Sequence, residues 1–143
     1  MPNWKMRFIT GGAGSQKTRA EQEEADFVAF VARVVRPAYS EIGRRLSEKG
    51  REITTQETRA ACGITVLNGS SMELMFRVTG LSMPVGVIPN VEVKMRERKG
   101  LRVESKRFPL RSPADKDSTI NGISADDIIE CFFIYYEEAL GRV

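Results

Sequence analysis

The side chains that most enzymes use for acid–base and nucleophilic chemistry are scarce in this chain. Histidine is absent, so proton transfer would have to rely on carboxylates or other groups. Cys62 and Cys131 lie in apolar runs without a nearby base or cation, which favours buried hydrophobic roles over nucleophilic ones. Glu137 and Glu138 are neighbours on a predicted helix and therefore face different directions. The sequence predicts no catalytic residue, no metal site and no cofactor, and an enzyme is the less favoured interpretation.

A glycine-rich segment near the N-terminus resembles part of a nucleotide-binding motif. Residues 11–18, GGAGSQKT, resemble the phosphate-binding loop G-x-x-x-x-G-K-[ST], whose backbone amides wrap phosphate oxygens. Gln16 replaces the second glycine, at a position where a side chain is least welcome. The strands that follow also show an antiparallel pattern, whereas the motif belongs to parallel sheets. We therefore interpret the segment as a lead-in to a helix.

A second short match to a known catalytic motif lies near residue 115. Asp115, Asp117 and Thr119 match the D-x-D-x-T string of haloacid-dehalogenase-like phosphatases, in which the first Asp attacks phosphorus. The string follows a polar segment here, whereas in that family it follows a buried strand near the start of the domain. The same acidic segment also resembles a calcium-binding loop. Such a loop needs a central glycine, and this chain has Ile120 at that position. A solvated acidic loop is the favoured interpretation.

The charges of the chain are distributed unevenly. Residues 91–111 carry eight Lys or Arg against three Glu, and residues 113–143 carry two against seven Asp or Glu. A positive tip of a two-stranded hairpin can contact phosphates or an acidic protein surface. The candidate residues for binding an anionic partner are Arg96, Arg98, Lys99 and Arg102. The competing and more common interpretation is a charged edge that prevents aggregation between sheets.

An apolar segment interrupted by proline and glycine forms the second candidate site. Residues 80–90 are too apolar for a plain solvent loop, but Pro84 and Pro89 argue against a central strand. Such a segment either covers the edge of a core or contacts a partner. Its candidate apolar contact residues are Leu81, Met83, Val85, Val87 and Ile88.

Helical patterns at both ends and strand patterns between them predict an α+β fold with an antiparallel sheet. Thr18 and Glu21 have the spacing of a capping box, and apolar residues then recur every three or four positions up to Gly50, with a kink or break expected at Pro37. Four to five strands form a meander. Ser124 caps a C-terminal helix over residues 125–140. We expect both helices on one face of the sheet.

The last two strands allow two registers. A three-residue loop over residues 98–100 pairs Met95 with Val103 and places both apolar rows on one face. A two-residue turn would pair Arg98 with Leu101 and put those rows on opposite faces. We predict the three-residue loop, which would also set Glu92 opposite Lys106.

Length and composition favour a single domain over residues 1–143, in which residues 1–16 are a flexible or strand-like lead-in. Two cysteines are too few for a disulfide framework, and the sequence shows neither a membrane-span pattern nor a signal-peptide pattern. A cytoplasmic location without membrane contact is therefore expected.

The functional prediction from sequence is a non-enzymatic protein-interaction or binding module. It is expected to form a homo-oligomer, because the apolar arcs of both helices are wider than one sheet face needs. The alternative is an accessory protein that binds nucleic acid through the basic hairpin tip.

Overall fold

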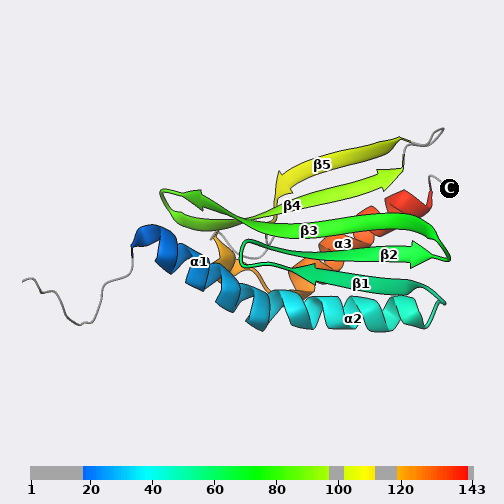
Figure 1. Cartoon of the computed structure of the whole chain (residues 1–143), viewed down its shortest axis with the longest axis horizontal. Coiled ribbons are helices and arrows are strands. Elements are labelled where there is room, and N and C mark those ends of the chain that lie inside the picture. The colour runs from blue at the N-terminus through cyan, green and yellow to red at the C-terminus, as the bar shows by residue number, and fades with distance from the viewer. Residues whose placement is uncertain (1–17, 97–101, 112–118, 142–143) are drawn as a thin grey trace, which may run out of the picture.

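The computed structural model of this chain describes residues 18–96, 102–111 and 119–141. A helical segment, a five-stranded antiparallel meander and a second helix follow one another, which confirms the predicted α+β class (Figure 1). The helical elements are α1 (Arg19–Phe30), η1 (Val31–Val35), α2 (Arg36–Ser47), η2 (Ile120–Gly122) and α3 (Ala125–Leu140). The strands are β1 (Glu52–Glu57), β2 (Ala61–Asn68), β3 (Ser71–Met83), β4 (Gly86–Arg96) and β5 (Val103–Pro109).

The first helical segment runs through Pro37 without a break. Thr18 caps it as predicted, because its hydroxyl accepts the Glu21 amide at 3.1 Å and the Glu21 carboxylate accepts the Thr18 amide at 3.0 Å. The turn before the proline, η1, is a π-helix in which the Arg36 amide bonds to the Val31 carbonyl. This wider turn accommodates the missing donor of Pro37, and the segment changes direction there (Figure 1).

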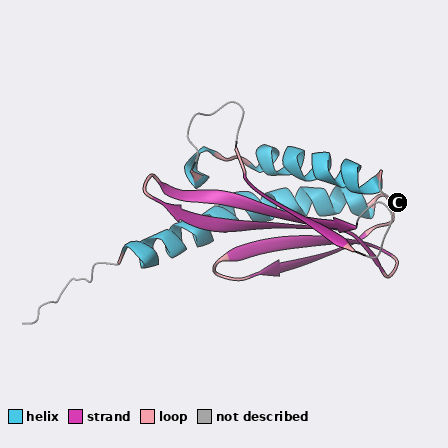
Figure 2. Ribbon diagram, turned by 90° about the horizontal axis from the view of Figure 1, so that it is seen from above, coloured by secondary structure: helices cyan, strands magenta, loops and turns pink. Residues whose placement is uncertain are grey.

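Both helices pack on the same face of the sheet. The fully buried Phe76 ring of β3 contacts Tyr39 of α2, with ring centroids 6.4 Å apart, and Phe132 of α3, at 5.5 Å. Figure 2 shows α2 and α3 side by side, and they also contact each other. The helices therefore cover much of each other's apolar surface within one chain. Their wide apolar arcs no longer argue for an oligomer.

The β2–β3 hairpin contributes one row of each strand to the core. Cys62, Ile64 and Val66 of β2 are buried, as are the residues opposite them on β3. The turn contains Gly69 with φ +65°, a conformation that favours glycine. The face of β2–β5 that points away from the helices is called the open face below.

The predicted register of the β4–β5 pair is wrong by one residue. Met95 lies opposite Glu104 instead of Val103, and Glu92 lies opposite Arg107 instead of Lys106. Val103 consequently lies on the open face, 48% exposed, whereas Met95 is fully buried. Lys106 and Phe108 instead face α3, where Lys106 pairs with Glu138 at 3.0 Å and Phe108 stacks on Tyr135. The inner side of this edge strand is partly polar, so apolar alternation indicated the wrong face.

Residues 80–83 and 86–90 belong to strands β3 and β4, whereas Pro84 and Pro89 argue against a central strand. They form the end of β3 and the start of β4, with Pro84 in the turn and Pro89 opposite Gly80. The solvated acidic loop predicted around residue 115 is followed by core residues, because Ile120 and Ile123 are buried. Residues 112–118 of that loop lie outside the described residues.

Candidate functional site

The most exposed apolar feature among the described residues is the far end of the β3–β4 hairpin. Residues 80–89, called the hairpin arm below, pair with each other in the register from Gly80–Pro89 to Met83–Gly86. The pairing of β3 with β2 ends at Thr79, and the pairing of β4 with β5 ends at Asn90. The arm therefore projects beyond the shared sheet and lies over α1 (Figure 1).

The inner side of the arm is held against α1. A Cβ atom on Gly80 would lie 2.8 Å from the Phe27 ring, so strand and helix approach as closely as a glycine allows. Ser82 donates to the Glu23 carboxylate at 2.7 Å, and Arg19 donates to the Met83 carbonyl at 2.6 Å. These contacts fix the position of an arm that would be marginally stable as an isolated two-stranded hairpin.

The outer side of the arm is apolar and open. Leu81 lies opposite Ile88, and because Gly80 faces α1, the neighbouring Leu81 faces away from it. The exposed fractions are 48% for Leu81, 39% for Met83 and 70% for Val85. Ile88 is half-buried, and Val87 is buried. The structure thus divides the five predicted contact residues: three are exposed, and Val87 belongs to the core.

A small pocket lies where the base of the arm, α1 and the β1–β2 turn meet. Its volume is about 250 Å³, and Phe27, Gly80 and Val87 are among the residues that line it. Arg59 of the turn and Glu24 of α1, which also line it, form an ion pair at 3.0 Å. The pocket is small for a cofactor, since ligand pockets usually enclose about 300–1,000 Å³.

The predicted anion-binding residues are only partly placed by the structure. Arg98 and Lys99 lie outside the described residues. Arg96 ends β4, on the same face of that strand as Lys94 and Glu92 by alternation, and nothing is described of its side chain. Arg102 is exposed just before β5. The hypothesis of a basic tip therefore stays a prediction.

A charged cluster at the centre of the open face was missed by the sequence analysis. Glu92 of β4 is only 4% exposed although none of the described helices covers that face. Arg77 of β3 and Arg107 of β5 lie directly opposite it on either side, and both form ion pairs with its carboxylate. The Arg107 Nε donates at 3.0 Å, and the Ser105 hydroxyl donates at 3.3 Å. Only the correct β4–β5 register brings these groups together.

The two neighbouring arginines keep the Glu92 carboxylate ionised. Burial alone would raise the pKa of this carboxyl, but the hydrogen bonds and charges of Arg107 and Arg77 together lower it below its ordinary value. Glu73 behaves in the same way: burial opposes ionisation, but Arg51 at 3.0 Å and the Tyr136 hydroxyl at 2.7 Å lower its pKa. Both carboxylates are therefore ionised partners within the fold.

Acid is expected to destabilise the protein through these two carboxylates. Because their pKa is lower in the folded state, the unfolded chain binds more protons as the pH falls past about 4.3. Their stabilising contribution is present above that pH and is lost as the pH falls through the folded-state pKa. Urea unfolding is measured from about pH 3 to about pH 7. The free energy of unfolding should depend less on pH for Glu92→Gln than for wild type. Parallel curves would contradict this assignment.

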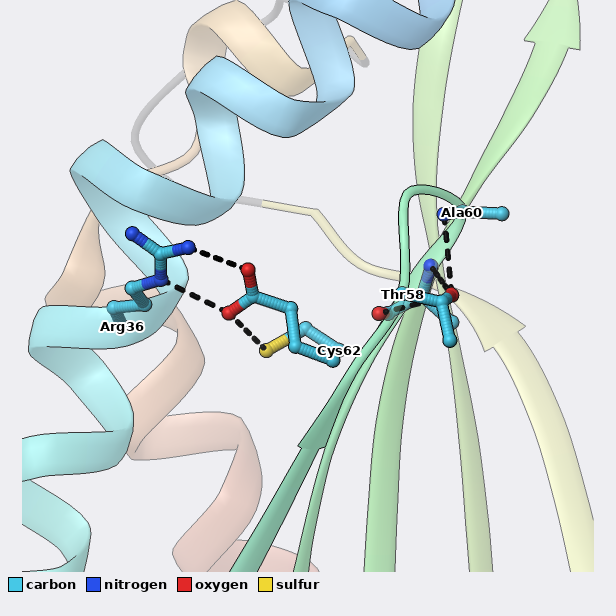
Figure 3. A network of polar contacts seen from close by, with 6 residues as sticks. Arg36, Thr58, Ala60 and Cys62 are labelled. Carbon is cyan, nitrogen blue, oxygen red and sulfur yellow. Dashed lines mark hydrogen bonds and ion pairs between the residues drawn. The ribbon is translucent and has the colours of Figure 1, made fainter.

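The thiols are poorly suited to nucleophilic chemistry. Burial, together with the Glu57 carboxylate, raises the pKa of the Cys62 thiol to about 11. Figure 3 shows Cys62 and Arg36 meeting at that carboxylate, to which the Arg36 Nε donates at 2.9 Å. Burial likewise raises the pKa of the Cys131 thiol to about 12. Both thiols stay protonated near neutral pH, and a protonated thiol is a weak nucleophile.

The remaining sequence motifs gain no structural support. Thr18, the last residue of the glycine-rich match, uses its hydroxyl to cap α1, and residues 11–17 lie outside the described residues. Thr119 caps η2, and Asp115 and Asp117 also lie outside them. No group of three or more His, Cys, Asp or Glu side chains in the described part of the chain could hold a metal ion.

Comparisons with known proteins do not indicate a function for this chain. No protein-family model, no curated protein and no solved structure matches this chain. None of the helices in residues 18–96, 102–111 and 119–141 is long and apolar enough to cross a membrane.

Proposed function

We propose that this protein is a non-enzymatic interaction module that associates with a second copy of itself through the outer side of the hairpin arm, in the simplest case as a homodimer. A reducing, cytoplasmic compartment is part of this proposal, because both cysteines are free. The observation that carries the proposal is the exposure of Leu81, Met83 and Val85 on an arm that projects beyond the sheet.

The composition of the arm supports a contact role. Residues 80–89 contain no charged side chain, whereas natural proteins usually place charges on exposed strand edges to prevent association. Neither edge of the arm pairs with another described strand, apart from the Pro89 carbonyl, which accepts the Leu110 amide at 2.8 Å. An uncharged apolar surface of this kind is energetically favourable to bury.

A second copy is the favoured occupant because an apolar surface without charges is complementary to itself. In a two-fold dimer the same patch serves both subunits, so Leu81 and Val85 of each copy can pack against the equivalent patch. Side-chain packing is favoured over strand pairing at the β4 edge, because Pro89 has no amide hydrogen to donate.

The test is the oligomeric state of wild type and of Leu81→Asp/Val85→Asp. Light scattering coupled to size-exclusion chromatography, at micromolar concentration, is expected to give a dimer mass for wild type and a monomer mass for the variant. The dissociation constant should rise by about 100-fold or more, since two apolar contacts are replaced by charges that must be desolvated. Both residues are exposed, so the thermal stability of the monomer should change little.

Ile134→Asp is the matched control. Ile134 is 60% exposed on α3, away from the arm, so it tests whether any exposed apolar residue has the same effect. The control is expected to remain dimeric. A wild-type protein that stays monomeric over the whole concentration range would refute self-association, and a dimer that survives the arm variant but is lost in the control would place the interface on α3.

A further inference from the structure

The open face of the sheet displays positive charge and conceals its negative charge. Arg77, Glu92 and Arg107 lie side by side across β3, β4 and β5, and Lys94 follows Glu92 by two residues on the same face. The side chains of Arg107 and Arg77 are 71% and 43% exposed, whereas that of Glu92 is 5% exposed. Solvent therefore meets the cations, with the carboxylate beneath them.

Within the described part of the chain, no other acid balances the charge of this face. Glu92 is the only acidic residue among the described open-face positions of β2–β5, so Arg77, Arg107 and Lys94 alone exceed it by two positive charges, before Arg96 at the end of β4 is counted. Lys94 makes no hydrogen bond or ion pair with any described side chain. The surplus is available to a ligand.

Glu92 leaves donors of both arginines unused. A guanidinium carries five N–H groups. Glu92 accepts from the Nε of Arg107, lies within ion-pair distance of its Nη2, and accepts from the Nη2 of Arg77. The Nη1 group of each arginine has no acceptor among the described residues. A carboxylate that holds two guanidinium groups in place reduces the entropy lost when they bind a second anion.

We propose that this face binds the phosphodiester backbone of nucleic acid without sequence specificity, through Arg77, Lys94 and Arg107. Thr79, Asn90 and Ser105 lie beside the cations on this face, with Met75 opposite Lys94 and Thr65 opposite Met75. Such hydroxyl and amide groups bind phosphate and sugar oxygens. No aromatic side chain lies among the described open-face positions, so the contacts go to the backbone and not to stacked bases.

A repeating anion is favoured over an acidic protein for a geometric reason. Neighbouring strands are about 4.8 Å apart, so the two arginines lie on strands roughly 10 Å apart with Lys94 between their strands. Nucleic acid carries a phosphate at every nucleotide and can meet several separated cations in many registers. An acidic protein would need carboxylates at matching positions. This proposal is independent of the hairpin arm.

The test is fluorescence anisotropy with a labelled DNA duplex of roughly 20 base pairs, titrated at salt concentrations from about 50 to 200 mM. Lys94→Glu is compared with Arg33→Glu, which makes the same change in net charge on η1, on the helical side of the molecule. Wild type should bind with a strong salt dependence. Lys94→Glu should weaken binding by about 10-fold or more at the lowest salt and reduce the salt slope by about 1. Arg33→Glu should change affinity less than about 2-fold.

Arg107→Gln provides the second variant. It removes one cation while Arg77 still pairs with Glu92, and it should reduce the salt slope by about 1 as well. Circular dichroism confirms that each variant is folded. Absence of salt-dependent binding by wild type would overturn the proposal, as would equal losses in Lys94→Glu and Arg33→Glu. Binding of poly-L-glutamate in place of the duplex would also overturn it and would identify an acidic protein surface as the ligand.

Discussion

Replacing Phe76 with alanine is expected to lower the free energy of unfolding by about 3 to 5 kcal/mol, the usual cost of deleting a buried aromatic ring. Phe76 is fully buried and is the residue of β3 that joins the sheet to both helices, through Tyr39 of α2 and Phe132 of α3. Its removal leaves a cavity at the junction of three elements, where none can move inward without losing contact with the others.

Urea unfolding followed by circular dichroism measures this loss. Phe76→Leu keeps most of the side-chain volume and should cost much less, about 1 to 1.5 kcal/mol. If both variants lost the same small amount, the three-way packing at Phe76 would not be the centre of the core. An unchanged denaturant slope in both variants would show that the comparison reports stability and not a change in the unfolded state.

The helices were predictable because local chemistry determines where they begin and end. The hydroxyl of Thr18 and the side chains of Ser124 and Asp127 satisfy free amides at the start of a helix, an interaction that depends only on residues three positions apart. The effect of Pro37 was also local, although the form it takes, a π-helical turn before the proline, depends on how the chain packs against the sheet.

The register of β5 was not predictable from alternation, because its inner side faces a partly charged helix. Lys106 lies on that inner side and pairs with Glu138 of α3, while the apolar Val103 lies on the open face. A rule that places every apolar residue inward fails where the covering helix presents carboxylates. The error concealed the site around Glu92, since the wrong register opposed Glu92 to Lys106.

The composition of the hairpin arm indicated an apolar contact segment, but its strand conformation was not predicted from the sequence. Pro84 and Pro89 argue against a central strand, yet Pro84 occupies the turn and Pro89 lies one residue beyond the last β4 residue that pairs with β5. Both positions tolerate a missing amide hydrogen. The sequence therefore indicated an apolar contact segment, and the three-dimensional arrangement was needed to separate the exposed Leu81 from the buried Val87.

Replacing Gly80 with alanine is expected to destabilise the fold by about 1 to 3 kcal/mol, the range observed when extra atoms are forced into a packed site. The new Cβ would lie 2.8 Å from the Phe27 ring and 3.1 Å from the Val87 side chain, and both of these residues are buried. The arm or α1 must therefore move. Because the outer side of the arm is the proposed contact with a second copy, the same change is expected to weaken self-association.

Gly63→Ala is the matched control, on the neighbouring strand β2. A Cβ there meets nothing closer than 3.6 Å, so alanine should fit and should stabilise the fold by about 0.4 to 1 kcal/mol through the unfolded state. Phe27→Leu shortens the obstructing ring, so a double-mutant cycle with Gly80→Ala should show a favourable coupling of about 0.5 kcal/mol or more. Additive effects would mean that Gly80 and Phe27 do not meet, and the arm would then not be held against α1 as described. Coupling with unchanged self-association would instead keep the arm in place and remove it from the interface.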